Sequence, residues 1–351
     1  MQIAEFAPAR PPCSVGEREA ATTVAARLRG LGLRPKTQEL RAPTSPTWAP
    51  LLRALFRVWG AAFLAAGWPL ATGVLAGLSL AGGVPLVAGL IRFLPLLGAK
   101  TWNIAAMRRG TDPESRPLVV TAHLDTHSTA EAPMPRPHTA LCAVSGLAAL
   151  SGAIAGRPGV TGSRWLAAAI AAEAIGTLIW LARRELAIPS DQPDDNTSGL
   201  LALVRLADLL SASKPVHSVW IVAAGAGTPG SFGITAFLRS RPDLNNAWVV
   251  DIDALGTGEV IASSIHARFP HPGTPPALAR AVALAARASG DPLSTRQVRR
   301  PHSGARAALR MRRSAIALTG GLRPPAGARG PDPANAERAA RVVDRLARLP
   351  T

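Results

Sequence analysis

The sequence predicts an α/β fold, with a mostly parallel sheet covered by helices on both faces and interrupted by two apolar helical hairpins. Two patterns predict this fold. Short runs of apolar and β-branched residues alternate with amphipathic segments of helical length, as in a parallel sheet with helices between its strands. Two long apolar stretches, at residues 51–97 and 139–182, break this alternation. A chain of 351 residues has room for one large domain or two small ones.

The first 45 residues predict one helix followed by one strand. Apolar residues recur at helical spacing between residues 15 and 33, and residues 34–40 predict a strand. Glu5 and Arg10 lie in the N-terminal segment with no apolar core behind them, so we expect no cleavable signal peptide.

The first apolar stretch predicts a pair of membrane-spanning helices. No charged residue occurs from Val58 to Ile91, a run of 34 residues. Because a spanning helix needs about 20 apolar residues, the stretch can hold two short helices with a turn at Gly67–Pro69 or at Ala81–Pro85. Trp59 and Trp68 suit a membrane interface. The alternative is a buried pair of helices in a large core.

Two strands are expected next, at Trp102–Arg109 and Leu118–Thr126, adjacent to each other and joined by a polar turn. A second apolar pair follows, in which residues 139–156 carry no charge and residues 165–182 carry only Glu173. A lone acidic residue in an apolar helix either marks a functional site or pairs with an arginine. The chain is therefore expected to divide into a soluble α/β domain in three pieces (1–50, 99–138 and 184–351) and two transmembrane hairpins (51–98 and 139–183).

Each predicted hairpin returns the chain to the side of the membrane that it left, which keeps the three soluble pieces together. Lysine and arginine gather at the helix ends on that side, and this bias predicts a cytoplasmic soluble domain on a bacterial-type inner membrane. The lipid bilayer is therefore an expected partner. The basic residues in question are Arg53, Arg57, Arg92, Lys100, Arg108, Arg109, Arg183 and Arg184.

The C-terminal part of the chain returns to alternating strands and helices. The expected strands are Val216–Ala224, Ala247–Ala254 and Ser314–Thr319, and the expected helices are Gly230–Ser240, Pro275–Ala288 and Ala334–Leu349.

The net charge of +17 comes mostly from arginine. A nucleic-acid-binding surface would combine basic residues with interleaved aromatics or a known module. The sequence has neither, and it contains no tyrosine. We therefore expect no nucleic-acid partner. Its two cysteines, Cys13 and Cys142, indicate neither a disulfide framework nor a metal site.

Two short motifs contain the side chains that can bind a metal ion. The strand expected at Leu118–Thr126 ends on His123-Leu124-Asp125, at the edge of the sheet where α/β folds bind ligands. There His123 can bind a metal while Asp125 holds its other ring nitrogen. The second motif, Asp194-Asp195-Asn196-Thr197-Ser198-Gly199, begins a helix, and its two carboxylates supply oxygen ligands for a divalent cation.

In this order and setting, the two motifs resemble those of the M28 family of zinc aminopeptidases. The resemblance extends over the chain outside the two hairpins. It implies a zinc aminopeptidase-like fold with two zinc ions bridged by one carboxylate, and a glutamate as general base. His123 resembles the first ligand, Asp195 the bridging carboxylate and Asp253 the third ligand of the same metal. Asp125 and Asp194 would support these ligands. Three protein ligands with an open fourth position are typical of catalytic zinc.

The other half of the family's site is missing. Gly227 stands where the family has its general-base glutamate, and Thr228 stands where it has a ligand of the second metal. Arg306 stands at the place of the last histidine ligand, and His302 is a nearby imidazole that could replace it. An arginine at this place can substitute for the charge of a missing cation. The resemblance therefore implies one zinc ion at most and no general base.

These patterns together predict a membrane-anchored M28 peptidase-like protein that is catalytically impaired, a pseudoenzyme that binds a peptide or protein ligand. One alternative is a zinc-dependent aminopeptidase or other hydrolase that works with a single metal. Another is a transport or membrane-assembly component in which the helices carry the function. A carboxylate base near Gly227 would favour the first alternative. Further buried polar residues in the helices would favour the second, and Glu173 alone qualifies.

Overall fold

The computed structural model of the chain describes residues 6, 9–45, 48–81, 98–126, 144, 147–148, 151, 161–185, 196–256, 258–265, 272–297, 304–320 and 332–350. The chain forms two compact units. The sheet unit consists of Met1–Thr44, Gly98–His127 and Ser190–Thr351, and the helical unit consists of Ser45–Leu97 and Ser128–Pro189. Each unit is therefore assembled from segments that are separated in the sequence.

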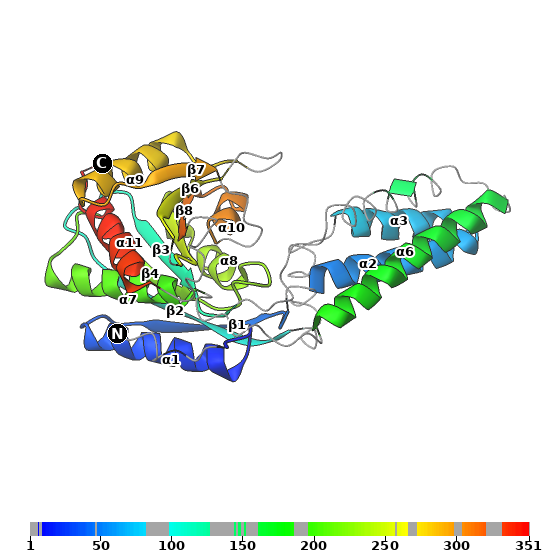
Figure 1. Ribbon diagram of the computed structural model, residues 1–351, viewed down its shortest axis with the longest axis horizontal. Helices are drawn as coiled ribbons and strands as arrows, with labels where there is room; N and C mark the ends of the chain where they lie inside the picture. Colours follow the sequence, from blue (N-terminus) through cyan, green and yellow to red (C-terminus); the bar gives the residue numbers. More distant parts are fainter. Residues whose placement is uncertain are drawn as a thin grey trace. The chain divides into compact units, whose positions relative to one another are not determined.

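The sheet unit is built on a mixed sheet whose order, over the described residues, is β1-β2-β4-β3-β5-β8-β6-β7 (Figure 1). The four central strands β4, β3, β5 and β8 run parallel to one another, which confirms the predicted mostly parallel sheet. Strands β1 and β2 on one side of these four, and β6 on the other, introduce antiparallel pairs, and β7 pairs with β6 in parallel at the far edge. The strands are β1 Lys36–Ala42, β2 Ala99–Arg108, β3 Leu118–His123, β4 Val219–Ala224, β5 Trp248–Asp253, β6 Val260–Ser264, β7 Ser294–Gln297 and β8 Ser314–Gly320.

Helices cover both faces of this sheet, as predicted. On one face, an apolar core joins the central strands to α1, α7, α9 and α11. On the other face, a second core packs the same strands against α8 and α10. The helices are α1 Val15–Gly30, α7 Thr197–Ala212, α8 Phe232–Arg239, α9 Pro276–Ala288, α10 Gly304–Arg310 and α11 Pro333–Leu346. Strand β3, buried on both faces, is apolar throughout except for Thr121 and His123.

The prediction that the second and third strands are neighbours was wrong, because β4 lies between them. The segment that links β2 to β3 runs along the residues that enter β4. The backbone N–H of Thr111 donates to Pro215, that of Asp112 to Val216 and that of Leu118 to Ser218. These hydrogen bonds hold the link against the start of β4, so that β2 pairs with one edge of that strand and β3 with the other.

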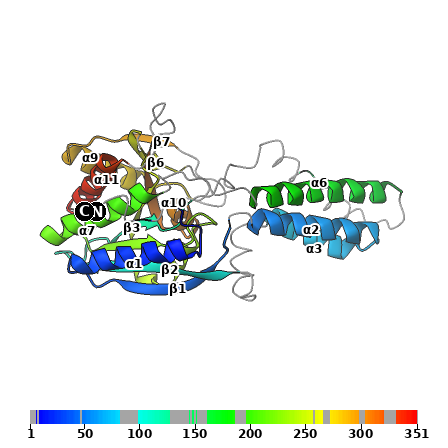
Figure 2. The same cartoon turned by 60° about the horizontal axis from the view of Figure 1, so that its bottom comes forward.

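The helical unit contains α2 Trp48–Ala65, α3 Pro69–Ala81 and α6 Thr161–Glu185, which lie side by side (Figures 1 and 2). A small core of Ala61, Leu64, Ala76, Ala167 and Ile170 joins them. Of the two turns that the first hairpin offered, the one at Gly67 separates α2 from α3. Gly67 adopts a φ of 76°, which a glycine reaches without steric penalty. Residues 82–97 lie outside the described part of the chain.

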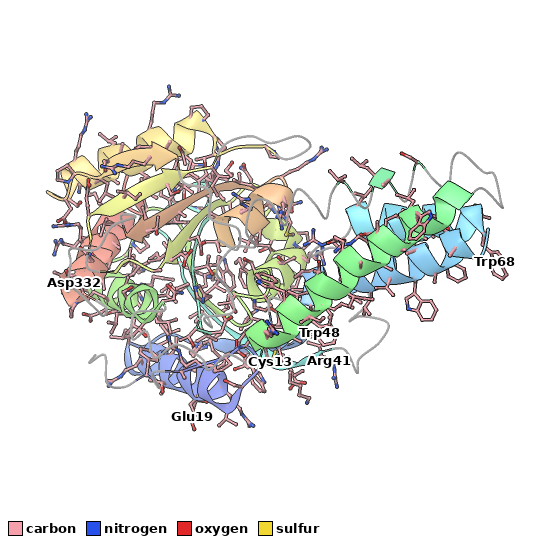
Figure 3. All side chains as sticks on the ribbon, turned by 45° about the vertical axis from the view of Figure 1, so that its right-hand side comes forward. Cys13, Glu19, Arg41, Trp48, Trp68 and Asp332 are labelled. Atoms are coloured by element: carbon pink, nitrogen blue, oxygen red, sulfur yellow. The ribbon has the colours of Figure 1, made fainter. Side chains whose placement is uncertain are left out.

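The described helices of the helical unit expose several large apolar side chains. Trp68, at the turn between α2 and α3 (Figure 3), is 62% exposed, and Leu70 is 82% exposed. Trp59, Val74, Trp165, Ile175 and Ile179 are also more than half or nearly half exposed. Among the described helices, α6 alone is long and apolar enough to cross a membrane, over Trp165–Arg183. This is one such helix, where the sequence predicted four.

Candidate functional site

The candidate site lies at the carboxyl ends of the parallel strands, where the predicted motifs meet. His123 is the last residue of β3, and Asp253 is the last residue of β5, the neighbouring strand. Asp125 follows β3, and Gly227 and Thr228 lie in the loop after β4, on the other side of β3. The parallel arrangement therefore brings together five of the residues that the sequence singled out.

His123 is held in one orientation by its Nδ1 atom. Nδ1 lies 2.7 Å from the backbone carbonyl oxygen of Asp125, which can only accept, so Nδ1–H is the donor. Nε2 then faces the Asp253 carboxylate, with Oδ1 at 3.4 Å. Burial lowers the pKa of His123, but its hydrogen bonds to Asp125 and Asp253 outweigh this effect and raise the pKa well above its usual value. An imidazole tethered through one nitrogen beside a carboxylate is a typical zinc-ligand arrangement.

The Asp125 carboxylate, fully buried, holds the loop after β4 more closely than it holds the imidazole. It accepts the backbone N–H of Gly227 at 2.7 Å and that of Thr228 at 2.8 Å. The Thr228 hydroxyl donates to it at 2.6 Å, whereas His123 Nδ1 is 3.4 Å away. Burial raises the pKa of Asp125, but the hydrogen bond from His123 and those from Thr228 leave the pKa below its usual value. The His-x-Asp motif thus joins β3 to this loop.

Gly227 occupies a position where any side chain would collide with the site. A Cβ at this position would lie 2.3 Å from Cβ and 2.8 Å from Cγ of His123, and 3.1 Å from Oδ1 of Asp125. Thr228 is buried and uses its hydroxyl hydrogen on Asp125. In this backbone, neither residue can be exchanged for glutamate without moving the loop.

The Asn-Thr-Ser-Gly part of the second motif has a structural role that the sequence did not predict. Asn196, with a φ of 57°, donates from Nδ2 to the carbonyl of His123 at 2.9 Å and accepts the N–H of Ala254 at 3.0 Å. Ser198 accepts the N–H of Leu255 at 3.0 Å. A Cβ on Gly199 would lie 2.8 Å from the Ile252 carbonyl oxygen, so glycine lets α7 approach β5. The motif therefore fastens the ends of β3 and β5 to the start of α7.

Arg306 lies on α10, a helix that the sequence did not predict. The N-terminus of α10 is held by Asp251 in β5, whose Oδ2 accepts the N–H of Ala305 at 3.0 Å. Helix α10 packs on β5 and β8. The stretch that was matched to the family's last histidine ligand thus forms a short helix beside the central strands. The role assigned to Arg306 stays a prediction.

Three of the predicted residues, Asp194, Asp195 and His302, lie outside the described part of the chain. Within that part, no three histidine, cysteine, aspartate or glutamate side chains are grouped closely enough to hold a metal ion. His123 and Asp253 fit two positions of a zinc ligand set, since they place an imidazole nitrogen and a carboxylate oxygen side by side. The third position would belong to Asp195.

Two buried charged residues next to the site were not predicted. Glu17 accepts hydrogen bonds from the N–H of Ala226 at 2.7 Å, and burial together with the charge of Asp125 raises the pKa of Glu17 to about 7. Arg10 donates from Nε to the Leu124 carbonyl at 2.8 Å and from Nη2 to the Thr197 hydroxyl at 3.1 Å. Ser14-x-x-Glu17 is a capping-box pattern at a helix start, so the sequence could have located Glu17 but not its partner. No sequence signal marks Arg10.

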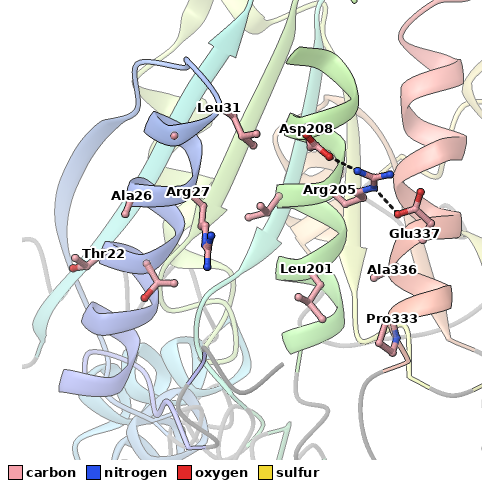
Figure 4. A pocket seen from close by; sticks show the side chains of 13 residues that line it. Thr22, Ala26, Arg27, Leu31, Leu201, Arg205, Asp208, Pro333, Ala336 and Glu337 are labelled. Atoms are coloured by element: carbon pink, nitrogen blue, oxygen red, sulfur yellow. Dashed lines mark hydrogen bonds and ion pairs between the residues drawn. The ribbon is translucent and has the colours of Figure 1, made fainter. Parts of the chain in front are cut away.

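A groove of about 1160 Å³ lies apart from these residues, between α1, α7 and α11 (Figure 4). Arg205 of α7 lines the groove and pairs with Asp208 and with Glu337 of α11. Neither His123 nor Asp253 lines the groove. It therefore adds nothing to the candidate site.

No protein-family model and no curated protein matches this chain. Solved structures do resemble it. A zinc aminopeptidase from Bacillus subtilis is 12% identical, with a TM-score of 0.56 over 98% of this chain and 92% of that one. An aminopeptidase from an Aneurinibacillus species is 10% identical, with a TM-score of 0.54 over 98% and 94% of the two chains. A glutaminyl cyclase from Tannerella forsythia is 13% identical, with a TM-score of 0.53 over 99% and 95%. The chain therefore has the fold that zinc aminopeptidases and glutaminyl cyclases share.

Proposed function

We propose that the chain is a membrane-anchored peptidase-like protein that has lost peptide hydrolysis and binds a peptide or protein partner. The observation that carries this proposal is the packing around Gly227. Gly227 stands at the position of the general-base glutamate and has no side chain. The space that a side chain would need is filled by His123 and Asp125. A positioned general base contributes about 10²–10⁴ in rate, so its loss removes most of the activity of a hydrolase.

The remaining metal chemistry is limited to one ion. His123 and Asp253, with Asp195, would hold zinc, and the Asp125 carbonyl, which accepts from Nδ1 of His123, leaves Nε2 as the nitrogen that would bind the ion. Bound zinc would supply Lewis acidity at this edge of the sheet. Thr228 donates its hydroxyl to Asp125, and its backbone N–H is taken by the same carboxylate. No second pair of ligands is supported among the described residues.

Membrane anchoring is proposed for the helical unit, as two transmembrane hairpins with the sheet unit in the cytoplasm. The exposed apolar side chains of α2, α3 and α6 support it, since large exposed apolar surfaces indicate contact with lipid or with another protein. Helix α6 has the length and composition of a spanning helix. The excess of lysine and arginine at the predicted helix ends supports the cytoplasmic orientation.

The pseudoenzyme proposal is tested by hydrolysis of aminoacyl reporter substrates by the full chain in detergent with zinc supplied. We expect no turnover above that of His123→Ala. Turnover by the unaltered protein that His123→Ala abolishes would reject the proposal. It would establish instead the single-metal aminopeptidase or hydrolase, which the side-by-side placement of His123 and Asp253 favours as second candidate.

The transport or assembly alternative has less support. It depended on Glu173 as a polar group within apolar helices, and Glu173 pairs with Arg57 of α2, with Oε2 and Nε 3.0 Å apart. Of the two interpretations of Glu173, pairing with an arginine is therefore confirmed.

A further inference from the structure

The loop after β4 is anchored by two fully buried carboxylates that come from distant parts of the chain. Asp125 accepts the backbone N–H groups of Gly227 and Thr228. Glu17, in the first turn of α1, accepts the N–H of Ala226 at 2.7 Å. Three successive backbone N–H groups thus donate to two carboxyl groups. Successive N–H groups in a turn form a typical binding site for anions.

The second oxygen of Glu17 connects the loop to the rest of the sheet unit. Oε2 accepts the hydroxyl of Thr101 in β2 and the backbone N–H of Cys13, each at 2.8 Å. Glu17 therefore joins the start of α1, an inner position of β2 and the loop after β4. A carboxylate that only capped α1 would need none of the contacts beyond Cys13.

The loop has a backbone that needs such support. Ala226 adopts a φ of 47°, in the left-handed region that a residue with a Cβ rarely enters. Such conformations persist when surrounding contacts hold them. The loop also approaches its neighbours closely, because a Cβ on Gly225 would lie 2.1 Å from the Thr101 hydroxyl oxygen.

We propose that Glu17 is a positioning residue that, with Asp125, locks residues Ala226–Thr228 against His123, whereas a two-zinc peptidase would hold the position of Thr228 through its second metal. This inference rests on the proposed function only for the correspondence between Gly227 and a catalytic glutamate. The lock itself consists of hydrogen bonds within this chain. It accounts for a loop that is tightly held although it binds no second metal.

Hydrogen exchange of the full chain in detergent tests the lock. In Glu17→Ala, the amide of Ala226 should exchange about tenfold faster or more, as expected for loss of a buried hydrogen bond. The amides of Gly227 and Thr228 should also exchange faster, because the loop then keeps only its Asp125 anchor. The amides of β4 should keep their protection. Ser14→Ala is the matched control, because Ser14 accepts the N–H of Glu17 at the same helix start without contacting the loop. It should speed exchange in the first turn of α1 alone.

A double-variant cycle gives a second readout. If the lock presses the loop onto His123, Gly227→Ala should lower the melting temperature less in the Glu17→Ala background than in the unaltered chain. Unchanged loop exchange in Glu17→Ala, or additive losses in the cycle, would overturn the lock. Peptide hydrolysis by the unaltered protein would instead reject the proposed function and leave the exchange result as it is, so the two failures are distinguishable.

Discussion

At the scale of single residues, the close packing around Gly227 makes the clearest prediction about stability. A methyl group at position 227 would lie 2.3 Å from Cβ of His123, much closer than packed side chains approach. We expect Gly227→Ala to lower the free energy of unfolding by about 1–3 kcal/mol, the usual range for overpacking. Gly30→Ala is the control, since a Cβ at the end of α1 meets nothing within 4 Å. Equal denaturant midpoints for the two variants would contradict this packing.

Glu17 gives the site a predictable pH dependence. Its pKa is raised from 4.5 to about 7 by burial and by the charge of Asp125. Between these values the folded chain binds more protons at Glu17 than the unfolded chain does. This residue's contribution to stability is therefore fully present below about pH 4.5 and is lost as the pH rises through about 7.

The Glu17 contribution can be isolated by comparing stability curves. The unfolding free energy of Glu17→Gln, measured by denaturant titration at several pH values, should lack the fall between pH 4.5 and 7 that the unaltered chain owes to this group. Glu19→Gln, at an exposed position of the same helix (Figure 3), should keep it. Parallel curves for the unaltered chain and Glu17→Gln would refute the assignment.

The sequence predicted the residues that end a strand and missed those that act through distant contacts. His123 and Asp253 could be located because each ends an apolar run that predicts a strand. The collision at Gly227 could not be predicted, because it involves a residue 104 positions away in the chain, the difference between 227 and 123. Glu17 and Ala226 are likewise 209 positions apart. Their proximity is a result of the strand order.

At the scale of elements, the Arg57–Glu173 pair joins α2 to α6. Both side chains are nearly buried, at 4% and 6% exposure, and Thr177 donates to Glu173 Oε1 at 2.8 Å. Removing one member of a buried pair leaves an uncompensated charge and costs about 3–5 kcal/mol in folded proteins. Replacing both members by apolar residues is often neutral.

We therefore expect Arg57→Met to reduce the thermal stability of the protein in detergent, and Arg57→Met/Glu173→Leu to restore most of it. The exchanged pair Arg57→Glu/Glu173→Arg is a further check, because it keeps both charges. If Arg57→Met alone leaves the melting temperature unchanged, the pair contributes nothing to the packing of α2 on α6.

The elements that the sequence did not predict are short. Strands β6 and β7 have five and four residues, and α10 has seven. Such runs are too brief to show a helical or alternating period. Longer elements were predicted within a few residues, for example Val219–Ala224 within the predicted strand from 216 to 224. The neighbours of β2 were not, because sequence adjacency does not fix strand order in a sheet with parallel crossovers.

At the scale of the whole molecule, the two units differ in surface character. Large apolar side chains are exposed along α2, α3 and α6, whereas the apolar residues of the sheet unit are concentrated in two cores. We expect the chain to remain in the membrane fraction after a carbonate wash, since apolar spans hold it there. Recovery of a soluble, folded chain without detergent would show that the apolar helices pack against protein instead.

The number of bound zinc ions is the most direct test of the proposed loss of the second metal site, because the hydroxyl of Thr228, at the place of a second-metal ligand, already donates to Asp125. Elemental analysis of the purified full chain in detergent should find one zinc ion per chain at most, and none in His123→Ala. His217→Ala should keep the zinc, because His217 is a buried histidine bonded to the carbonyls of Arg116 and Leu349. Two tightly bound zinc ions per chain would contradict the account.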